Sequence, residues 1–390
     1  MAVRLATYNV ENLFLRAKAL NTSTWQDGQP ALEAWARFNA LAANSVYSQQ
    51  DKAQMLDDLQ TLKIIRKTVN GRVLNWEPFD AWALLRENKG DFIKQPKKGD
   101  AVIVATGRDD WIGWAELITE NVDEVAARMT AKVISELAAD VLCVIEAESR
   151  PALVRFNDEL LGGHYGHAML VDGNDPRGID VGLYSTLAID IRAVSSNVDV
   201  IDEEDPKRGL LFSRDCPVYR LSLPDGDELV LLVNHLKSQS RSTKDDPDIR
   251  RTRQSNRVRA IYDELRDQGA EYVAVLGDLN KGPKPDGQQP TLEALVGPGS
   301  PLVDATTIGG FDLGPRPGTF EACSLANRLD YILMSPELAA RATGGGIFRK
   351  GLWGNPKNKK PPRDWKVYDE ITNAEQSASD HAAVWVDLDL

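Results

Sequence analysis

Cysteine and histidine are scarce in this chain, which has three cysteines and four histidines among its 390 residues. Cys143, Cys216 and Cys323 form no CxxC pair, and their odd number argues against a disulfide framework or a zinc site. Such cysteine usage suits a reducing compartment, and the amino-terminal residues contain no apolar signal segment. We therefore expect a cytoplasmic protein.

Several functional signatures are also missing. No apolar run approaches the roughly 18 residues of a membrane span. The sequence has no GxxxxGK[ST] loop, no GxGxxG loop and no Ser or Cys in a nucleophile elbow. These absences disfavour a membrane partner, P-loop and dinucleotide chemistry, and acyl transfer.

The net charge of −12 is unevenly distributed along the chain. Residues 237–259 carry eight Lys/Arg against three Asp, and residues 341–366 carry eight against one Asp. Two basic segments therefore stand out from an acidic body, which allows a polyanionic partner in spite of the overall charge.

Short β-type runs organise the chain, and several of them are apolar throughout, as in strands covered on both faces. They lie at 3–10, 140–148, 180–185, 229–237, 272–280, 328–335 and 382–390. Amphipathic helical patterns follow at 122–137, 153–161 and 258–265. Strands and helices interleave irregularly, which predicts a mixed-sheet sandwich and not a regular βαβ winding.

Residues 17–121 interrupt this order. The stretch is rich in Trp, Gln, Asn and Lys. We interpret it as an insertion, helical at 31–68 and with a hairpin at 101–117, in a single domain that spans residues 1–390.

Polar side chains stand at the ends of the apolar strands. Asn9, Glu146, His235, Asp278 and Asn280 close their strands, whereas Asp330 and His381 stand at the starts of theirs. If the last two strands run antiparallel to the others, all seven side chains meet at one edge of the sheets. Binding sites are commonly built at such an edge.

This set of residues supports a restricted chemistry. Hard oxygen ligands without cysteine suit Mg²⁺ or Mn²⁺, which leave coordination positions for phosphate oxygens. Imidazoles beside carboxylates act as acids or bases, or stabilise a charged transition state. Metal-assisted attack of water on a phosphate ester is the reaction that remains.

Taken together, the motifs resemble the endonuclease/exonuclease/phosphatase superfamily, which includes DNase I-like and exonuclease III-like enzymes. The resemblance rests on TYNVENLF (7–14), DVLCVIEAE (140–148), VNHLKSQ (233–239), LGDLN (276–280), LDYIL (329–333) and SDH (379–381). It covers residues 1–16 and 122–390. One departure is Ile145, because many relatives have Gln directly before the metal-binding Glu.

The resemblance implies an α+β fold, a four-layer sandwich of two packed mixed β-sheets flanked by helices. It also implies that Asn9, Glu146 and Asp380 surround the metal ion. Asp278 and Asn280 would orient or deprotonate the attacking water. His381, paired with Asp330, would polarise the phosphate, and His235 would donate a hydrogen bond to it.

Further residues are expected to bind the substrate. Arg177 precedes the predicted strand at 180–185, where similar family members place a phosphate-contacting side chain, and we expect it to contact the phosphate. Lys237 follows His235 by two residues, so it lies on the same strand face and could reach the phosphate, with a structural salt bridge as the alternative. In the second basic segment, Phe348, Trp353 and Trp365 are interleaved with cations that include Lys357, Lys359 and Lys360, a pattern typical of backbone tracking and base stacking.

We therefore expect a Mg²⁺- or Mn²⁺-dependent phosphodiesterase, a nuclease that acts on DNA or RNA. No feature indicates a protein partner. One alternative is a phosphatase or phosphodiesterase acting on a small phosphorylated metabolite or lipid head group, with the insertion closing the site against polymers. The other is a non-catalytic binding protein on the same fold.

Overall fold

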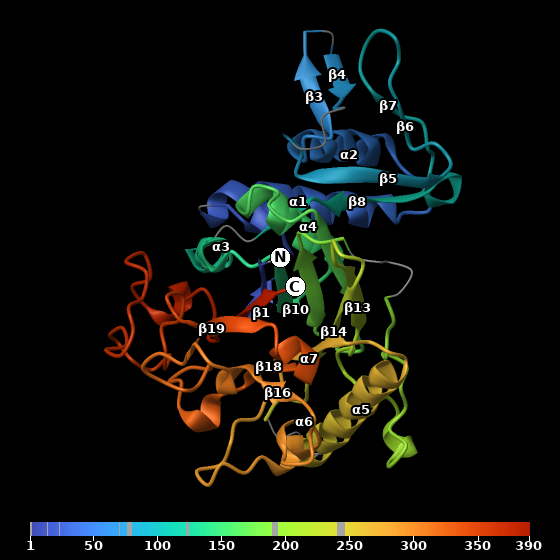
Figure 1. Cartoon of the computed structure of the whole chain (residues 1–390). Coiled ribbons are helices and arrows are strands. Elements are labelled where there is room, and N and C mark those ends of the chain that lie inside the picture. The colour runs from blue at the N-terminus through green and yellow to red at the C-terminus, as the bar shows by residue number, and fades with distance from the viewer. Residues whose placement is uncertain are drawn as a thin grey trace. The chain divides into compact units, whose positions relative to one another are not determined.

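The computed structural model of the chain describes residues 2–13, 15–22, 24–69, 71–75, 80–121, 125–188, 194–239 and 246–390. The chain divides into two units, which Figure 1 shows with their elements labelled. Unit 1 comprises Met1–Phe14 and Asp123–Leu390, and unit 2 comprises Leu15–Val122. Each unit has its own hydrophobic core.

A seven-stranded mixed sheet forms one half of unit 1, in the order β11-β12-β10-β1-β20-β19-β17. Its strands are β1 (Ala2–Leu13), β10 (Val141–Ala147), β11 (His167–Val171), β12 (Asp180–Ser185), β17 (Phe311–Asp312), β19 (Ala342–Phe348) and β20 (Ala383–Asp389). The strands from the two ends of the chain, β1 and β20, are hydrogen-bonded neighbours inside this sheet.

A five-stranded mixed sheet forms the other half, in the order β13-β14-β15-β18-β16. Its strands are β13 (Val218–Ser222), β14 (Glu228–His235), β15 (Tyr272–Asp278), β16 (Val303–Asp304) and β18 (Asp330–Met334). Apolar residues on both faces of β14 and β15 are buried, as expected for strands covered on two sides.

Helices cover the outer faces of both sheets. They are α3 (Val125–Leu137) and α4 (Arg150–Leu160) on one sheet and α5 (Pro247–Asp267) and α6 (Glu293–Val296) on the other. The short helix α7 (Pro336–Ala339) instead packs Leu338 into the cluster between the sheets. The side chain of Asp246 caps α5, and Pro247 occupies its first turn, where no backbone N–H is required.

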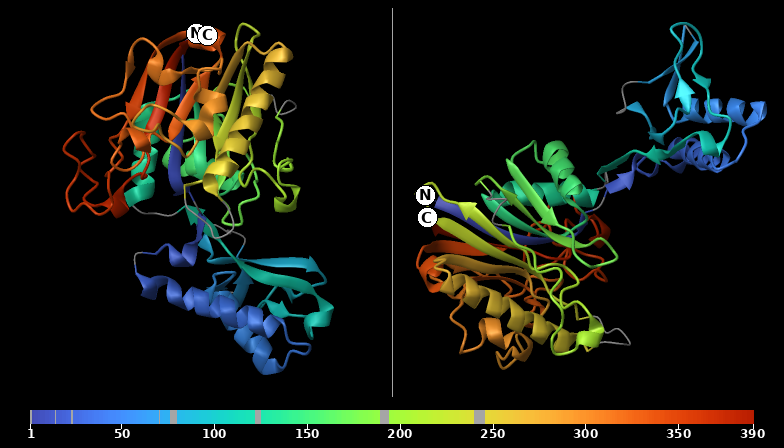
Figure 2. Two further views of the ribbon diagram at one scale, coloured as in Figure 1. Left: turned by 90° about the horizontal axis from the view of Figure 1, so that it is seen from below. Right: turned by 90° about the vertical axis from the view of Figure 1, so that its right-hand side faces the viewer.

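Three hydrophobic clusters separate four layers. The first joins α3 and α4 to the seven-stranded sheet, the second lies between the sheets, and the third joins the five-stranded sheet to α5 and α6. Figure 2 shows the sheets face to face with these helices outside them. The predicted four-layer sandwich of two mixed sheets is therefore confirmed.

The strand directions bring the predicted polar residues to one edge. β1 runs parallel to β10, and β14 runs parallel to β15. β20 is antiparallel to β1, and β18 is antiparallel to β15. The starts of β18 and β20 therefore meet the ends of the other four strands, as the sequence predicted.

Unit 2 contains two helices and four small antiparallel pairs of strands. Its elements are β2 (Leu15–Ala17), α1 (Trp25–Ala42), α2 (Gln49–Thr61), β3 (Ile65–Thr68), β4 (Gly71–Leu74), β5 (Ala83–Lys89), β6 (Ile93–Lys94), β7 (Val102–Ile103), β8 (Ile112–Leu117) and β9 (Thr119–Asn121). Phe38, Phe92 and Trp111 lie in its core.

Two predictions for this segment are wrong. The helical stretch at 31–68 is two helices, because the second begins anew at a capping box formed by Ser48 and Asp51. The 101–117 hairpin does not form, because β7 pairs with β6 and β8 pairs with β5.

None of the helices in the described part of the chain has the length and apolar character needed to cross a membrane.

Candidate active site

A pocket of about 340 Å³ lies in unit 1 at the edge where these strand ends meet. Its lining includes seven predicted residues and several that were not predicted. The lining residues are Glu11, Glu146, Arg177, Arg214, His235, Ser238, Gln239, Asp278, Asn280, Phe320, Leu329, Asp380 and His381.

A β-bulge directs Glu146 into the pocket. The pairing of β10 with β12 shifts between Ile145 and Ala147, so Glu146 is the extra residue of that pair, with a φ of 70°. The pairing with β1 shifts at the same place, because Asn9 lies opposite Ile145 and Leu13 lies opposite Ala147. Its neighbours Ile145 and Ala147 are completely buried, whereas 19% of its own side chain is exposed. The bulge therefore turns a carboxylate out of an otherwise buried strand.

Asn9 holds the carboxylates in position. Its amide nitrogen donates to Oε1 of Glu146 at 3.3 Å and to Oδ2 of Asp278 at 3.2 Å. Its Oδ1 accepts from the backbone N–H of Glu11 at 3.1 Å. In this arrangement the nitrogen of Asn9 faces the two carboxylates and its oxygen faces the backbone of Glu11.

Glu11 joins the site although the sequence analysis did not select it. Its Oε2 accepts from the backbone N–H of Asp380 at 2.8 Å. Burial, together with the charge of Asp380, raises the pKa of Glu11 to about 7. Burial also raises the pKa of Asp380, and the charge of Glu146 adds to this effect. These three carboxylates repel one another, and a cation would relieve the repulsion.

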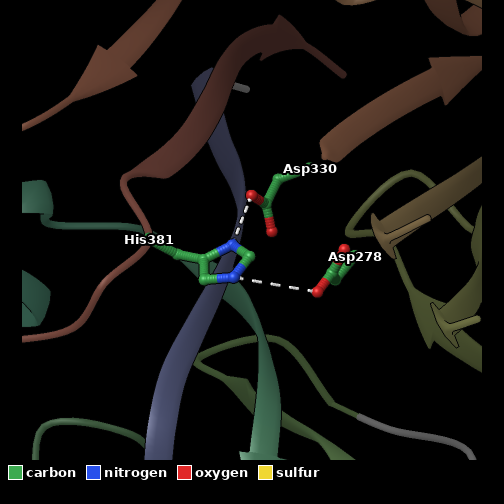
Figure 3. A group of neighbouring side chains, drawn as sticks. All are labelled: Asp278, Asp330 and His381. Atoms are coloured by element: carbon green, nitrogen blue, oxygen red, sulfur yellow. Dashed lines mark hydrogen bonds and ion pairs between the residues drawn. The ribbon is translucent and has the colours of Figure 1, made fainter. Parts of the chain in front are cut away.

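His381, Asp330 and Asp278 form a buried cluster, which Figure 3 shows. Nδ1 of His381 lies 2.8 Å from Oδ2 of Asp330, and Nε2 lies 3.9 Å from Oδ2 of Asp278. Burial alone would lower the pKa of His381, but Asp330, Asp278 and Asp380 together raise it well above its usual value. The imidazole is therefore held protonated by its carboxylate neighbours.

His235 is the second histidine of the pocket and, unlike His381, is uncharged. Its Nε2 lies 3.7 Å from both Oε1 of Glu146 and Oδ2 of Asp278. Burial lowers the pKa of His235 far below its usual value, and the charges of Arg214 and His381 add to this effect. The pocket thus contains one charged and one neutral imidazole.

Asp278 lies between these two histidines. Burial, reinforced by Asp330, raises the pKa of Asp278 to about 7. The backbone N–H of Asn280 donates to its Oδ1 at 2.8 Å, and the Asn280 amide donates to the carbonyl of Leu236 at 3.1 Å. The carboxyl group is therefore fixed in place and titrates near neutral pH.

Two arginines line the pocket, and both lie next to the same carboxylate, that of Asp175. Asp175 accepts from Arg177 at 2.8 Å and lies 3.3 Å from Nε of Arg214. The side chain of Arg177 is 62% exposed, whereas that of Arg214 is 4% exposed. Arg214 was not predicted, because residues 209–217 form no regular strand or helix to which a motif could be assigned.

Several predicted substrate contacts lie outside this pocket. The side-chain amino group of Lys237 lies 3.4 Å from Oγ of Ser238 and does not line the pocket, because β14 ends at His235 before the predicted strand face reaches Lys237. Lys357, Lys359 and Lys360 are exposed on the segment between β19 and β20.

The first basic segment is not a free cationic surface in its described part. Arg251 is fully buried, Arg253 pairs with Asp202, and Arg259 pairs with Asp263. Residues 240–245 lie outside the described residues. The second segment also differs from expectation, because Arg349 is buried and donates to the carbonyls of Leu313 and Gly318.

The donor set fits a divalent metal ion. Glu11, Glu146 and Asp380 offer hard carboxylate oxygens at the pocket wall, with partial exposure that leaves room for water and substrate. Among the described residues, the group of three whose ligand atoms all lie within 4.8 Å of one another is a different one, Asp278, Asp330 and His381. In that second group, however, the hydrogen bond between His381 and Asp330 already occupies two of the atoms.

Several solved structures are similar to this chain. An endonuclease/exonuclease/phosphatase family protein from Bacteroides thetaiotaomicron is 18% identical, with a TM-score of 0.48, 67% of this chain covered and 88% of that chain. A mannosyl-6-phosphatase from the same organism is 16% identical, with a TM-score of 0.47 and coverage of 68% and 91%. Truncated TDP2 from Caenorhabditis elegans is 16% identical, with a TM-score of 0.44 and coverage of 68% and 92%.

No curated protein matches the chain. The sequence profile of the Endonuclease/Exonuclease/phosphatase family matches residues 121–381, which include most of the pocket lining described above. The chain therefore belongs to the Endonuclease/Exonuclease/phosphatase family, whose members are phosphoric ester hydrolases.

Proposed function

We propose that the chain is a divalent-metal-dependent phosphodiesterase that hydrolyses DNA or RNA. The proposal rests above all on the composition of one pocket. The pocket contains three carboxylates, those of Glu11, Glu146 and Asp380, together with the charged imidazole of His381 and the neutral imidazole of His235. A non-catalytic binding protein would not need this combination of groups.

We assign the metal to Glu146 and Asp380, with Glu11 as an additional ligand. When bound, Mg²⁺ or Mn²⁺ would act as a Lewis acid toward a phosphate oxygen and neutralise the carboxylates. We assign Asn9 to positioning, because its amide nitrogen donates to Glu146 and to Asp278.

The remaining residues have distinct roles in this proposal. Asp278, whose pKa is close to neutral, orients the attacking water and accepts its proton, with Asn280 fixing the carboxyl group. The protonated His381, held by Asp330, stabilises charge that develops on the phosphate. Neutral His235 donates a hydrogen bond to a phosphate oxygen, and Arg177 and Arg214 add positive charge.

The proposed unit of function is a single catalytic domain. Residues 1–14 and 123–390 share one pair of packed sheets, and the separate core of Leu15–Val122 supports the interpretation of that segment as an insertion. All three cysteines are free and buried, which supports a reducing, cytoplasmic location.

A hydrolysis panel tests the function directly. Purified protein is supplied with Mg²⁺ or Mn²⁺ and with plasmid DNA, single-stranded DNA, RNA, bis-p-nitrophenyl phosphate or p-nitrophenyl phosphate. We expect cleavage of nucleic acid and of the small diester, and none in EDTA. Cleavage of the monoester alone would instead indicate a metabolite phosphatase, and a blank panel would indicate a binding protein.

The metal assignment has a matched pair of variants. Glu146→Gln removes a ligand charge at the pocket and is expected to lower the turnover of the small diester by about 10³-fold or more. Glu148→Gln changes a carboxylate two residues away that does not line the pocket, and its turnover should stay close to wild type. Equal turnover in Glu146→Gln and wild type would refute the assignment.

A further inference from the structure

A second groove in unit 1 is larger than the catalytic pocket. Its volume is about 610 Å³, and its walls come from residues 316–322 and 353–365. The second wall belongs to the segment between β19 and β20, which reaches the catalytic edge at Asp380 and His381. Nothing in the proposed reaction uses this groove.

The groove has an excess of positive charge. Arg316, Lys359, Lys360 and Arg363 line it, against a single carboxylate, Asp364. That carboxylate is engaged by Arg316 at 2.5 Å. Within the described part of the chain, no carboxylate pairs with Lys359, Lys360 or Arg363. Three cations are therefore available to an anionic ligand.

The wall that carries these cations is held in a fixed shape. Nε1 of Trp353 donates to the carbonyl of Asn358 at 3.0 Å, and Nε1 of Trp365 donates to the carbonyl of Leu352 at 2.9 Å. Trp353 is only 2% exposed, so its predicted use for base stacking is wrong. Trp365 is half-buried and lines the groove, so part of its indole surface remains available.

The groove and the catalytic pocket are lined by neighbouring residues of one backbone segment. Phe320 lines the catalytic pocket and packs against His381, with ring centres 4.8 Å apart. Ala322, two residues later, lines the groove. Glu321 between them donates from its backbone N–H to the carbonyl of Asp380 at 2.9 Å. Two residues span at most roughly 7 Å, so the linings of the two cavities meet on one turn of the backbone.

We infer that this groove binds a single-stranded polynucleotide segment that flanks the scissile phosphate. The inference rests on the proposed function and adds the substrate class to it. Cations that have no carboxylate partner can bind the phosphates of a polynucleotide backbone. An indole surface inside a concave groove can stack against a base that is not paired with another base. A duplex keeps its bases stacked inside, so it can contact the exposed lysines but cannot place a base against Trp365.

Binding is measured apart from catalysis. A fluorescent single-stranded oligonucleotide is titrated in EDTA with full-length Glu146→Gln protein carrying Lys359→Ala and Lys360→Ala. We expect affinity to fall about tenfold or more at 0.1 M salt. The log–log salt slope should fall by roughly 1.4, at about 0.7 for each lost contact with a single strand. The matched control, Lys97→Ala with Lys98→Ala in unit 2, should bind like the parent.

Two aromatic variants test stacking. Trp365→Phe keeps an aromatic face and should retain affinity to within about threefold, whereas Trp365→Leu should lose about tenfold. Equal affinities for these two variants would overturn the stacking role. Equal affinity of the parent protein for duplex and single-stranded oligonucleotides would overturn the preference for single strands.

Hydrolysis separates this inference from the proposed function. In otherwise wild-type protein, Lys359→Ala with Lys360→Ala should raise the KM for single-stranded DNA and leave turnover of bis-p-nitrophenyl phosphate within about twofold. An equal loss on both substrates would overturn the inference, because the segment would then support the catalytic pocket. If wild-type protein binds the oligonucleotide through these lysines but hydrolyses no diester, the groove stands and the proposed function fails.

Discussion

The charge on His381 depends on its neighbours, because burial alone would remove it. Asp330 accepts from Nδ1 at 2.8 Å and thereby holds both the charge and the orientation of the ring. We therefore expect Asp330→Asn and His381→Ala each to lower turnover of the small diester by about 10²–10⁴-fold, with the double variant little worse than His381→Ala. Steady-state kinetics of the three variants tests this coupling.

Losses that multiply in the double variant would show that the two residues act independently. Thermal unfolding of each variant provides the control, because Asp330 is buried and its replacement could disturb folding.

Arg214 and Arg177 share Asp175 but differ in exposure, which predicts different contributions. A charge removed from water interacts more strongly with a phosphate than an exposed charge does. Arg214→Met should lower kcat/KM for the small diester by about 10²-fold, and Arg177→Met by less than about tenfold. Similar losses in the two variants would contradict this assignment, and Arg214→Lys tests whether charge alone suffices.

Most of the predicted residues that line the pocket could be selected from the sequence because they close or open apolar strands. Asp278 and His235 are adjacent in the register of β14 and β15, which alternation and strand ends can suggest. Glu11 and Arg214 were missed for different reasons. Glu11 is turned into the site by a backbone with a φ of 50°, and Arg214 lies on an irregular segment. Neither feature leaves a periodic signal in the sequence.

At the scale of elements, Asp180 is the first residue of β12, and burial destabilises the ionised form of its side chain. Its Oδ1 accepts from the backbone N–H of Gly173 at 2.8 Å, yet burial raises its pKa from 3.8 to about 6. The native state therefore binds the proton more tightly than the unfolded state does. Stability should fall as pH rises from about 4 to about 6, by about 3 kcal/mol for a shift of about two pKa units.

Asp180→Asn tests this prediction. The substitution keeps an oxygen for Gly173 and removes the charge, but adds a buried N–H₂ group that costs about 1–2 kcal/mol. Near pH 7 the variant should be about 1–2 kcal/mol more stable than wild type, and near pH 4 it should not be. Denaturant unfolding at both pH values measures the difference, and a pH-independent difference would refute the explanation.

The sequence also predicted the elements unevenly. All seven predicted strands form, with ends within about three residues, because their apolar runs are long. Within the two large sheets it missed β11, β13, β16, β17 and β19. The last of these contains three successive glycines, and strand propensity disfavours glycine. Pairing with β20 stabilises it, and that contact comes from sequence more than thirty residues away.

At the scale of the whole molecule, the insertion begins and ends at one point. Leu15 and Asn121 are partners in the antiparallel pair β2–β9. A short turn can therefore replace residues 18–118 without stretching the chain. Because unit 1 has its own cores, we expect the trimmed protein to fold and to hydrolyse bis-p-nitrophenyl phosphate within about threefold of wild type.

Cooperative unfolding and small-diester turnover of the trimmed protein provide the test. Loss of both would show that unit 1 requires unit 2. A gain in turnover on single-stranded DNA would show that the insertion restricts access of polymers.

The pairing of β1 with β20 also sets when the protein becomes active as it is made. Ala2 pairs with Asp389, so strand β1 waits for nearly the whole chain before one of its two neighbours exists. At synthesis rates of about 5–20 residues per second, the wait is roughly 20–75 s. Asp380 and His381 emerge at the end of that interval. A nascent chain therefore lacks Asp380 and His381, and with them a complete edge of strand ends, until translation has passed these residues.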